Sequence, residues 1–185
     1  EVLIGLAGAL TEPEARTLLA RAFDRFPSGE RAPREPRPTA PRRRRGRRVV
    51  AVHKPERAQT QLYVGTLGVR MGHRDQYPLT VANTAFGGTF TSRLVHAVRS
   101  ERGWSYGAAS TLGADRQREA WSMWTHPSAA QLVECLRLEL ELLEEWLDRG
   151  LSAEEVERAK TYLLKSHAFE RETPLARLEG QLETA

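Results

Sequence analysis

Residues 83–94 read Asn-Thr-Ala-Phe-Gly-Gly-Thr-Phe-Thr-Ser-Arg-Leu, and residues 98–107 read Val-Arg-Ser-Glu-Arg-Gly-Trp-Ser-Tyr-Gly. The adjacent glycines Gly87 and Gly88 indicate the end of one helix, and Gly103 indicates the end of the next. The aromatic residues that follow Gly103 are typical of the entry into a strand. The two stretches therefore predict two helices and a helix-to-strand corner, around which the remaining elements can be placed.

Upstream of this centre, the sequence predicts three strands and two helices. Helical spacing gives residues 77–86 as the helix before the glycine pair, and Thr89 or Thr91 is expected to cap the helix that follows. The other upstream elements are a strand over 2–8, a helix that starts at a capping box from Thr11 to Glu14 and stops at 27–29, and strands over 49–52 and 61–68.

Downstream, the pattern indicates a β-hairpin with strands over 105–112 and 119–125 and a turn at 113–116. A long amphipathic helix follows over 128–148, and a capping box beginning at Ser152 opens a second long helix. The order of elements predicts an α+β fold, with a mainly antiparallel sheet that helices cover on one face.

The size and composition fit one compact domain over residues 1–185. The chain is 40% hydrophobic and 28% charged, which is typical of a folded domain and not of a disordered or membrane-spanning chain. No apolar run is long enough to cross a bilayer, and the first residues lack the layout of a signal peptide. Because the sequence starts inside an apparent extended segment, we expect a fragment of a longer chain, and the compartment stays open between the cytoplasm and the periplasm.

Positive charge is concentrated in residues 31–48, which we expect to form an internal Pro/Arg-rich linker. This segment holds nine of the 28 basic residues but one of the 24 acidic residues, so the rest of the chain has a net negative charge. An arginine-rich run can neutralise phosphates, yet no aromatic residues for stacking on bases alternate with these arginines. We therefore expect no nucleic-acid partner, and we interpret the segment as a solvated connector.

Residues that could bind a metal are few and scattered. Cys135 is the sole cysteine and lies on an apolar helical stripe, which favours a small core residue over a reactive thiol. No histidine has a second histidine at the helical spacing that zinc sites use. The five histidines are His53, His73, His96, His126 and His167. The sequence predicts no metal site in this chain.

The glycine pair, the Ser-Arg-Leu helix start at 92–94, the Arg-Ser-Glu helix end at 99–101 and the Gly-x-x-Tyr at 103–106 together resemble the second-domain signature of the pitrilysin/insulinase (M16) zinc metallopeptidases. The apolar start at 3–8 and the acidic helix start at 154–160 resemble the same domain. The resemblance covers nearly the whole chain. It implies the fold of the LuxS/mitochondrial-processing-peptidase-like metallohydrolases and, within that family, the non-zinc-binding C-terminal domain.

The resemblance also implies that the zinc ligands lie in another domain and that this domain supplies residues that contact the peptide. In this family zinc is bound by an inverted His-x-x-Glu-His motif in another domain, and this chain has no such motif, so we expect it not to be catalytic alone. The family's second half supplies an Arg and a Tyr seven residues apart, and Arg99 and Tyr106 match that spacing. Peptide hydrolysis builds negative charge on the carbonyl oxygen, which a phenol can stabilise, while a guanidinium can grip the peptide backbone.

Local alternatives stay open for each candidate. Arg99 can neutralise a helix C-terminus, and Tyr106 can be a sheet residue with a hydrated hydroxyl. Gly87 and Gly88 can line a peptide chamber or simply stop a helix. Arg93 can bind substrate or pair locally with Glu101.

The resemblance implies a non-catalytic, substrate-clamping domain or subunit of a zinc peptidase. Its partners would be a zinc-bearing half, fused or separate, and a peptide substrate, in a dimer or clamshell assembly, with zinc held by the partner domain. The alternative is a peptidase-like assembly subunit without a proteolytic role.

Overall fold

The computed structural model describes residues 3–26 and 46–184. They fall into two compact units, one of His53–Lys165 and the other of Glu1–Val52 with Ser166–Ala185. The residues that carry the predicted site all belong to the first unit. Most of the predicted linker, residues 31–45, lies outside the described residues, so the linker and the single domain over 1–185 stay predictions.

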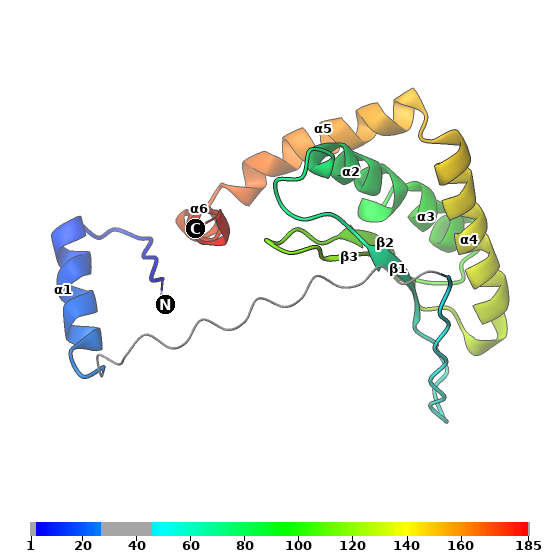
Figure 1. Cartoon of the computed structure of the whole chain (residues 1–185), viewed down its shortest axis with the longest axis horizontal. Helices are drawn as coiled ribbons and strands as arrows, with labels where there is room; N and C mark the ends of the chain where they lie inside the picture. Colours follow the sequence, from blue (N-terminus) through cyan, green and yellow to red (C-terminus); the bar gives the residue numbers. More distant parts are fainter. Residues whose placement is uncertain (1–2, 27–45, 185) are drawn as a thin grey trace. The chain divides into compact units, whose positions relative to one another are not determined.

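The first unit is built on a three-stranded antiparallel sheet in the order β1-β3-β2 (Figure 1). The strands are β1 (Leu62–Leu67), β2 (Ala108–Leu112) and β3 (Ala120–Thr125). β2 and β3 form the predicted hairpin, with Leu112 opposite Trp121. Alternation along β3 buries Trp121, Met123 and Thr125, while the residues between them are more exposed. The sheet therefore has one face in the core, as the sequence predicts.

Helices cover that core face. They comprise α2 (Gln76–Asn83), a π-helical turn η1 (Thr84–Gly88), α3 (Arg93–Val95), a second π-helical turn η2 (His96–Glu101), a 3₁₀ turn η3 (Ala129–Gln131), and α4 (Leu132–Arg149), which precedes α5 (Ala153–Glu170). Phe86 and Leu94 from this layer are fully buried with Met123 of the sheet. The stacked rings of Phe86 and Trp146, with centroids 4.5 Å apart, join η1 to α4. The α+β prediction with helices on one face is confirmed.

A short polar network fastens α2 and η1 to the sheet. The Asn83 side-chain oxygen accepts hydrogen bonds from the Ser110 hydroxyl at 2.7 Å and from the Trp121 indole N–H at 2.9 Å. The Asn83 amide in turn donates to the Ser110 carbonyl at 3.2 Å. Because each partner of this partly buried amide is satisfied, the network fixes the position of the glycine pair without leaving polar atoms unpaired.

Helix ends match the sequence in part. Gly103 has a φ of 62° and ends η2 as predicted. The predicted cap at Thr89 or Thr91 is wrong, because the residue at the N-cap of α3 is Ser92. The glycine pair does not stop an α-helix directly. Instead the helix widens into η1, and Gly88 is its last residue.

The second unit contains α1 (Glu12–Phe23), α6 (Pro174–Thr184) and the end of α5. The predicted capping box is present, since the Glu14 carboxylate accepts hydrogen bonds from the Thr11 N–H at 2.8 Å and the Thr11 hydroxyl at 2.7 Å. The segment before α1 lies against α6, where the Leu178 side chain approaches Gly5 closely. Helix α6 was not predicted; the sequence analysis ended with α5.

Two predicted strands are absent from the described residues. Residues 3–8 and 49–52 have no strand hydrogen bonding. A strand needs a partner to accept and donate its main-chain hydrogen bonds. Here the apolar side chains that prompted the prediction are instead largely exposed, with Val49 at 90%. Apolar and β-branched composition alone was therefore not sufficient.

None of the described helices is both long and apolar enough to cross a membrane.

Candidate functional site

Arg99 and Tyr106 flank the corner at which the helical layer turns into the sheet. Arg99 lies in η2, and Tyr106 lies two residues before the start of β2. The turn between them is closed by two main-chain hydrogen bonds, from the Gly103 N–H to the Arg99 carbonyl at 3.1 Å and from the Trp104 N–H to the Val98 carbonyl at 3.0 Å. Gly103 permits this reversal because its positive φ is strained for residues with a Cβ. π-helical turns like η2 are frequent at functional sites.

The structure brings the two predicted residues into contact. The Arg99 Cζ lies 4.1 Å from the centre of the Tyr106 ring. A second ring, that of Phe90, lies 4.4 Å from the same atom. Both distances are within the range of a favourable cation–π contact, which is about 6 Å. The guanidinium therefore has aromatic contacts from two rings.

The polar groups of this pair are available to a ligand. Within the part of the chain that the structure describes, neither the Arg99 guanidinium nor the Tyr106 hydroxyl has a hydrogen-bond or ion-pair partner. Tyr106 is 81% exposed, and Arg99 is partly buried. Stacking occupies the faces of a guanidinium but leaves the in-plane N–H groups free to donate to carbonyl or carboxylate oxygens.

Two further residues hold the corner from inside. Ser105 is buried; its hydroxyl donates to the Gly107 carbonyl and accepts the His126 main-chain N–H at 2.8 Å. Gly107 lies against Trp124, whose indole would be 3.0 Å from a Cβ at this position. The buried Ser105 side chain faces the sheet, and the side chain of its neighbour Tyr106 is exposed to solvent.

Sequence reasoning missed Phe90 and Ser105 as members of the site. A large aromatic residue in the polar connection between Gly88 and Ser92 was the one available signal for Phe90. Ser105 carries no comparable signal, because its partners lie two and 21 residues away along the chain.

Gly87 and Gly88 differ in their surroundings. Gly87 is buried against β2, and a Cβ there would lie 2.7 Å from the Ser110 main-chain nitrogen. Only glycine allows η1 to approach the strand this closely without a shift. Gly88 is exposed. Their predicted role in substrate binding stays a prediction, and for Gly87 the close packing provides a structural reason for the residue.

Arg93 forms an ion pair that joins the start of α3 to the start of α5. It donates to the two Glu155 carboxylate oxygens at 2.9 and 2.8 Å and to the Gly150 carbonyl at 3.3 Å. The Arg93 hydrogen bonds hold the pKa of Glu155 below its usual range and raise the pKa of Arg93. The alternative pairing with Glu101 is wrong, since Glu101 lies beside His96. Substrate binding by Arg93 stays a prediction.

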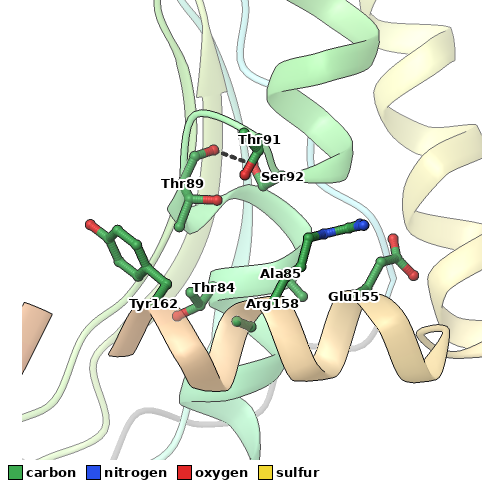
Figure 2. Close-up of a pocket in the computed structure, with 9 residues that line it drawn as sticks. Thr84, Ala85, Thr89, Thr91, Ser92, Glu155, Arg158 and Tyr162 are labelled. Atoms are coloured by element: carbon green, nitrogen blue, oxygen red, sulfur yellow. Dashed lines mark hydrogen bonds between the residues drawn. The ribbon is translucent and has the colours of Figure 1, made fainter. Parts of the chain in front are cut away.

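A small pocket of about 40 Å³ lies between α5 and the connection that leads to α3 (Figure 2). Figure 2 shows Thr89, Thr91 and Ser92 on one side and Tyr162, Arg158 and Glu155 on the other. A space of this size holds a few water molecules and is far too small for a peptide.

The described residues do not suit a zinc ion. Among them there is no group of three or more His, Cys, Asp or Glu side chains that could hold a metal. Cys135 is buried beside Glu139, and burial raises the pKa of its thiol to about 11, so the thiolate that zinc requires is disfavoured.

Comparison with known proteins identifies one family for most of the chain. The sequence model described as "Peptidase M16 inactive domain" matches residues 2–163. The chain is 30% identical over 137 residues to the uncharacterised zinc protease Rv2782c of Mycobacterium tuberculosis, and 29% identical over 107 residues to the uncharacterised zinc protease YmxG of Bacillus subtilis. These alignments cover 71% and 58% of this chain, and 31% and 26% of the relatives, so the chain spans about a third or less of their length.

Solved structures give the same result. A peptidase M16 inactive domain from Pseudomonas fluorescens superimposes with a TM-score of 0.62 and 28% identity, over 68% of this chain and 30% of that one. A protease from Helicobacter pylori has a TM-score of 0.73 at 16% identity, over 92% of this chain and 41% of that one, which shows a shared fold. The chain therefore belongs to the peptidase M16 family of zinc proteases, as a domain of the inactive type.

Proposed function

We propose that this chain is the substrate-clamping partner of a zinc-bearing M16 half, and that it supplies Arg99 and Tyr106 to the peptide held at that half's zinc site. The observation that carries the proposal is the contact between the partly buried Arg99 and the exposed Tyr106. Their hydrogen-bond donors have no partner within the described residues, and the main-chain turn between them keeps the two side chains close together. The role is non-catalytic in the sense that the metal and its ligands belong to the other half.

Each side chain suits a different part of the substrate. The Arg99 N–H groups can donate to two acceptors at once, which suits the carbonyl oxygens or a carboxylate of an extended peptide. The Tyr106 hydroxyl can donate one hydrogen bond to the carbonyl oxygen that gains negative charge as the peptide bond is hydrolysed. Arg99 would thus chiefly set the position of the peptide, and Tyr106 would lower the barrier to the reaction.

Tyr106→Phe tests the second role. The substitution keeps the ring that stacks on Arg99 and removes only the hydroxyl. Loss of one oxyanion donor typically costs about 3 kcal/mol of transition-state stabilisation. When this chain is mixed with a zinc-bearing half, we therefore expect kcat for peptide cleavage to fall about a hundredfold, with KM little changed. Tyr63→Phe, at an exposed tyrosine of β1, is the matched control and should leave kcat unchanged.

Arg99→Ala tests the clamping role. We expect KM for a peptide substrate to rise about tenfold or more, because a charge-assisted hydrogen bond contributes about 1.5–3 kcal/mol. Assembly with the zinc-bearing half, measured by light scattering, should be unchanged. Full activity of both Arg99→Ala and Tyr106→Phe with intact assembly would contradict the proposal and indicate a structural assembly subunit.

A further inference from the structure

We propose that Phe90 is a positioning residue that acts through Arg99, and this inference rests on the function proposed for Arg99. Phe90 lies in the connection between η1 and α3, outside the family-like Arg/Tyr pair. The Arg99 Cζ lies over the Phe90 ring, 4.4 Å from its centre, as it lies over the Tyr106 ring at 4.1 Å. The role we assign is to orient the Arg99 donors; Phe90 need not touch the reacting atoms.

The exposure of Phe90 is hard to explain by packing. The residue is 62% exposed, although a phenylalanine gains stability mainly by leaving water. It is not a member of the buried cluster that holds Phe86, four residues earlier. Within the described residues, the Phe90 ring contacts the Arg99 guanidinium. A surface aromatic residue with that contact suggests a function at the surface.

Hydrogen bonds fix the backbone around Phe90 and so restrict the position of its ring. Thr89 is extended, with φ −134° and ψ 164°. Its carbonyl accepts hydrogen bonds from both the Ser92 N–H at 3.1 Å and the Ser92 hydroxyl at 2.5 Å, and Figure 2 marks the hydroxyl bond. Ser92 is itself buried. This tight turn carries Phe90 at a defined position.

Two rings restrict a guanidinium more than one does. A single ring contact leaves the long arginine side chain free to turn away, and a second contact within cation–π distance makes that motion less favourable. Acceptors can then approach in the guanidinium plane, where the N–H groups point. Phe90 would therefore lower the entropy that Arg99 loses when a peptide binds, and its removal should weaken binding while sparing the chemical step.

The first experiment measures the Phe90–Arg99 contact directly in this chain. In a ¹⁵N-arginine-labelled sample, the Arg99 Nε–Hε resonance, assigned with Arg99→Lys, should be displaced by the neighbouring rings. We expect Phe90→Leu to move the resonance towards the position of an unstacked arginine, and Phe90→Trp to keep it displaced. An Arg99 resonance that is identical in Phe90→Leu and the unaltered chain would overturn the inference by itself.

The second experiment measures peptide cleavage by the chain mixed with a zinc-bearing half. We expect Phe90→Leu to raise KM about fivefold, because that factor corresponds to the free energy of one cation–π contact. We expect kcat to change by less than about twofold. Phe90→Trp should restore KM. In the Arg99→Ala background, Phe90→Leu should have no additional effect. A KM change of the same size in that background would show that Phe90 acts without Arg99 and would overturn the positioning role.

The two readouts separate the two possible failures. The resonance can move as expected while the Arg99→Ala chain, mixed with the zinc-bearing half, cleaves peptide normally. In that case the function proposed for Arg99 is wrong, and the positioning role of Phe90, which rests on it, is wrong too. If Arg99→Ala impairs cleavage and Phe90→Leu alters neither the resonance nor KM, the proposed function stands and the inference about Phe90 is wrong.

Discussion

Glu139 is a fully buried carboxyl group at the contact between α4 and β3, and its replacement by glutamine tests how the core responds to pH. One oxygen accepts a hydrogen bond from the Thr125 hydroxyl at 2.6 Å and lies 3.8 Å from the Cys135 sulfur, while the other oxygen has no partner within the described structure. Burial raises the pKa of Glu139 to about 7, because the charged form loses its hydration. The Cys135 thiol, with a pKa of about 11, stays neutral below pH 9.

The sign and size of the effect follow from the difference in pKa between the folded and unfolded states. Glu139 has a pKa of about 7 when folded and an ordinary value of 4.5 when unfolded, so the folded state binds the proton more tightly. The stabilisation that this provides is fully present below pH 4.5 and is lost as pH rises through 7. Because each unit of pKa corresponds to somewhat more than 1 kcal/mol, the free energy of unfolding should fall by roughly 2 to 3 kcal/mol between pH 5 and pH 8.

Glu139→Gln removes this titration while keeping the shape and an acceptor for Thr125. We expect the variant to resemble the unaltered chain in stability at pH 5, where Glu139 is mostly protonated, and to exceed it by roughly 2 to 3 kcal/mol at pH 8. Urea unfolding followed by fluorescence of the core residues Trp121 and Trp146 measures both curves. Parallel curves for the two proteins from pH 5 to pH 8 would refute the reasoning.

Two other substitutions test the packing around the site. Arg93→Ala should lower the free energy of unfolding by about 2 kcal/mol at pH 7, because it removes the cation paired with the partly buried Glu155 carboxylate and leaves that carboxylate the Ser152 N–H. The deficit should shrink in acid as Glu155 is protonated, and urea titrations at pH 7 and pH 3 measure it. Gly87→Ala should cost about 2 kcal/mol, since the new Cβ would meet the Ser110 main chain, whereas Gly180→Ala, with open space around it, should be neutral or stabilising in the same assay.

The sequence predicted those elements whose pattern is repeated over several residues. Alternation of buried and exposed positions identified β3, and apolar residues at helical spacing identified α4 and α5, because each pattern reports which face is buried. Capping boxes at Thr11 and Ser152 also predicted the start of two helices well, since both ends of the motif are close in sequence.

Features that depend on distant partners were not predictable in this way. The strand predicted over 49–52 has the right composition, but a strand exists only where another chain segment pairs with it. The contacts of Arg93 with Glu155 and of Phe90 with Arg99 join residues 62 and nine positions apart, and neither spacing is one that a regular helix or strand brings together. Arg99 and Tyr106 were found through family resemblance, and the structure adds that their side chains touch.

The most direct test of the account is a complementation titration. A zinc-bearing M16 half is held at fixed concentration, this chain is added in increasing amounts, and hydrolysis of a fluorogenic peptide is followed. We predict that each component alone is inactive, that the rate rises to a plateau with the unaltered chain, and that a doubly substituted chain with Arg99→Ala and Tyr106→Phe binds the half with the same midpoint but restores less than about 1% of the plateau. An equal plateau for the doubly substituted chain would contradict the account.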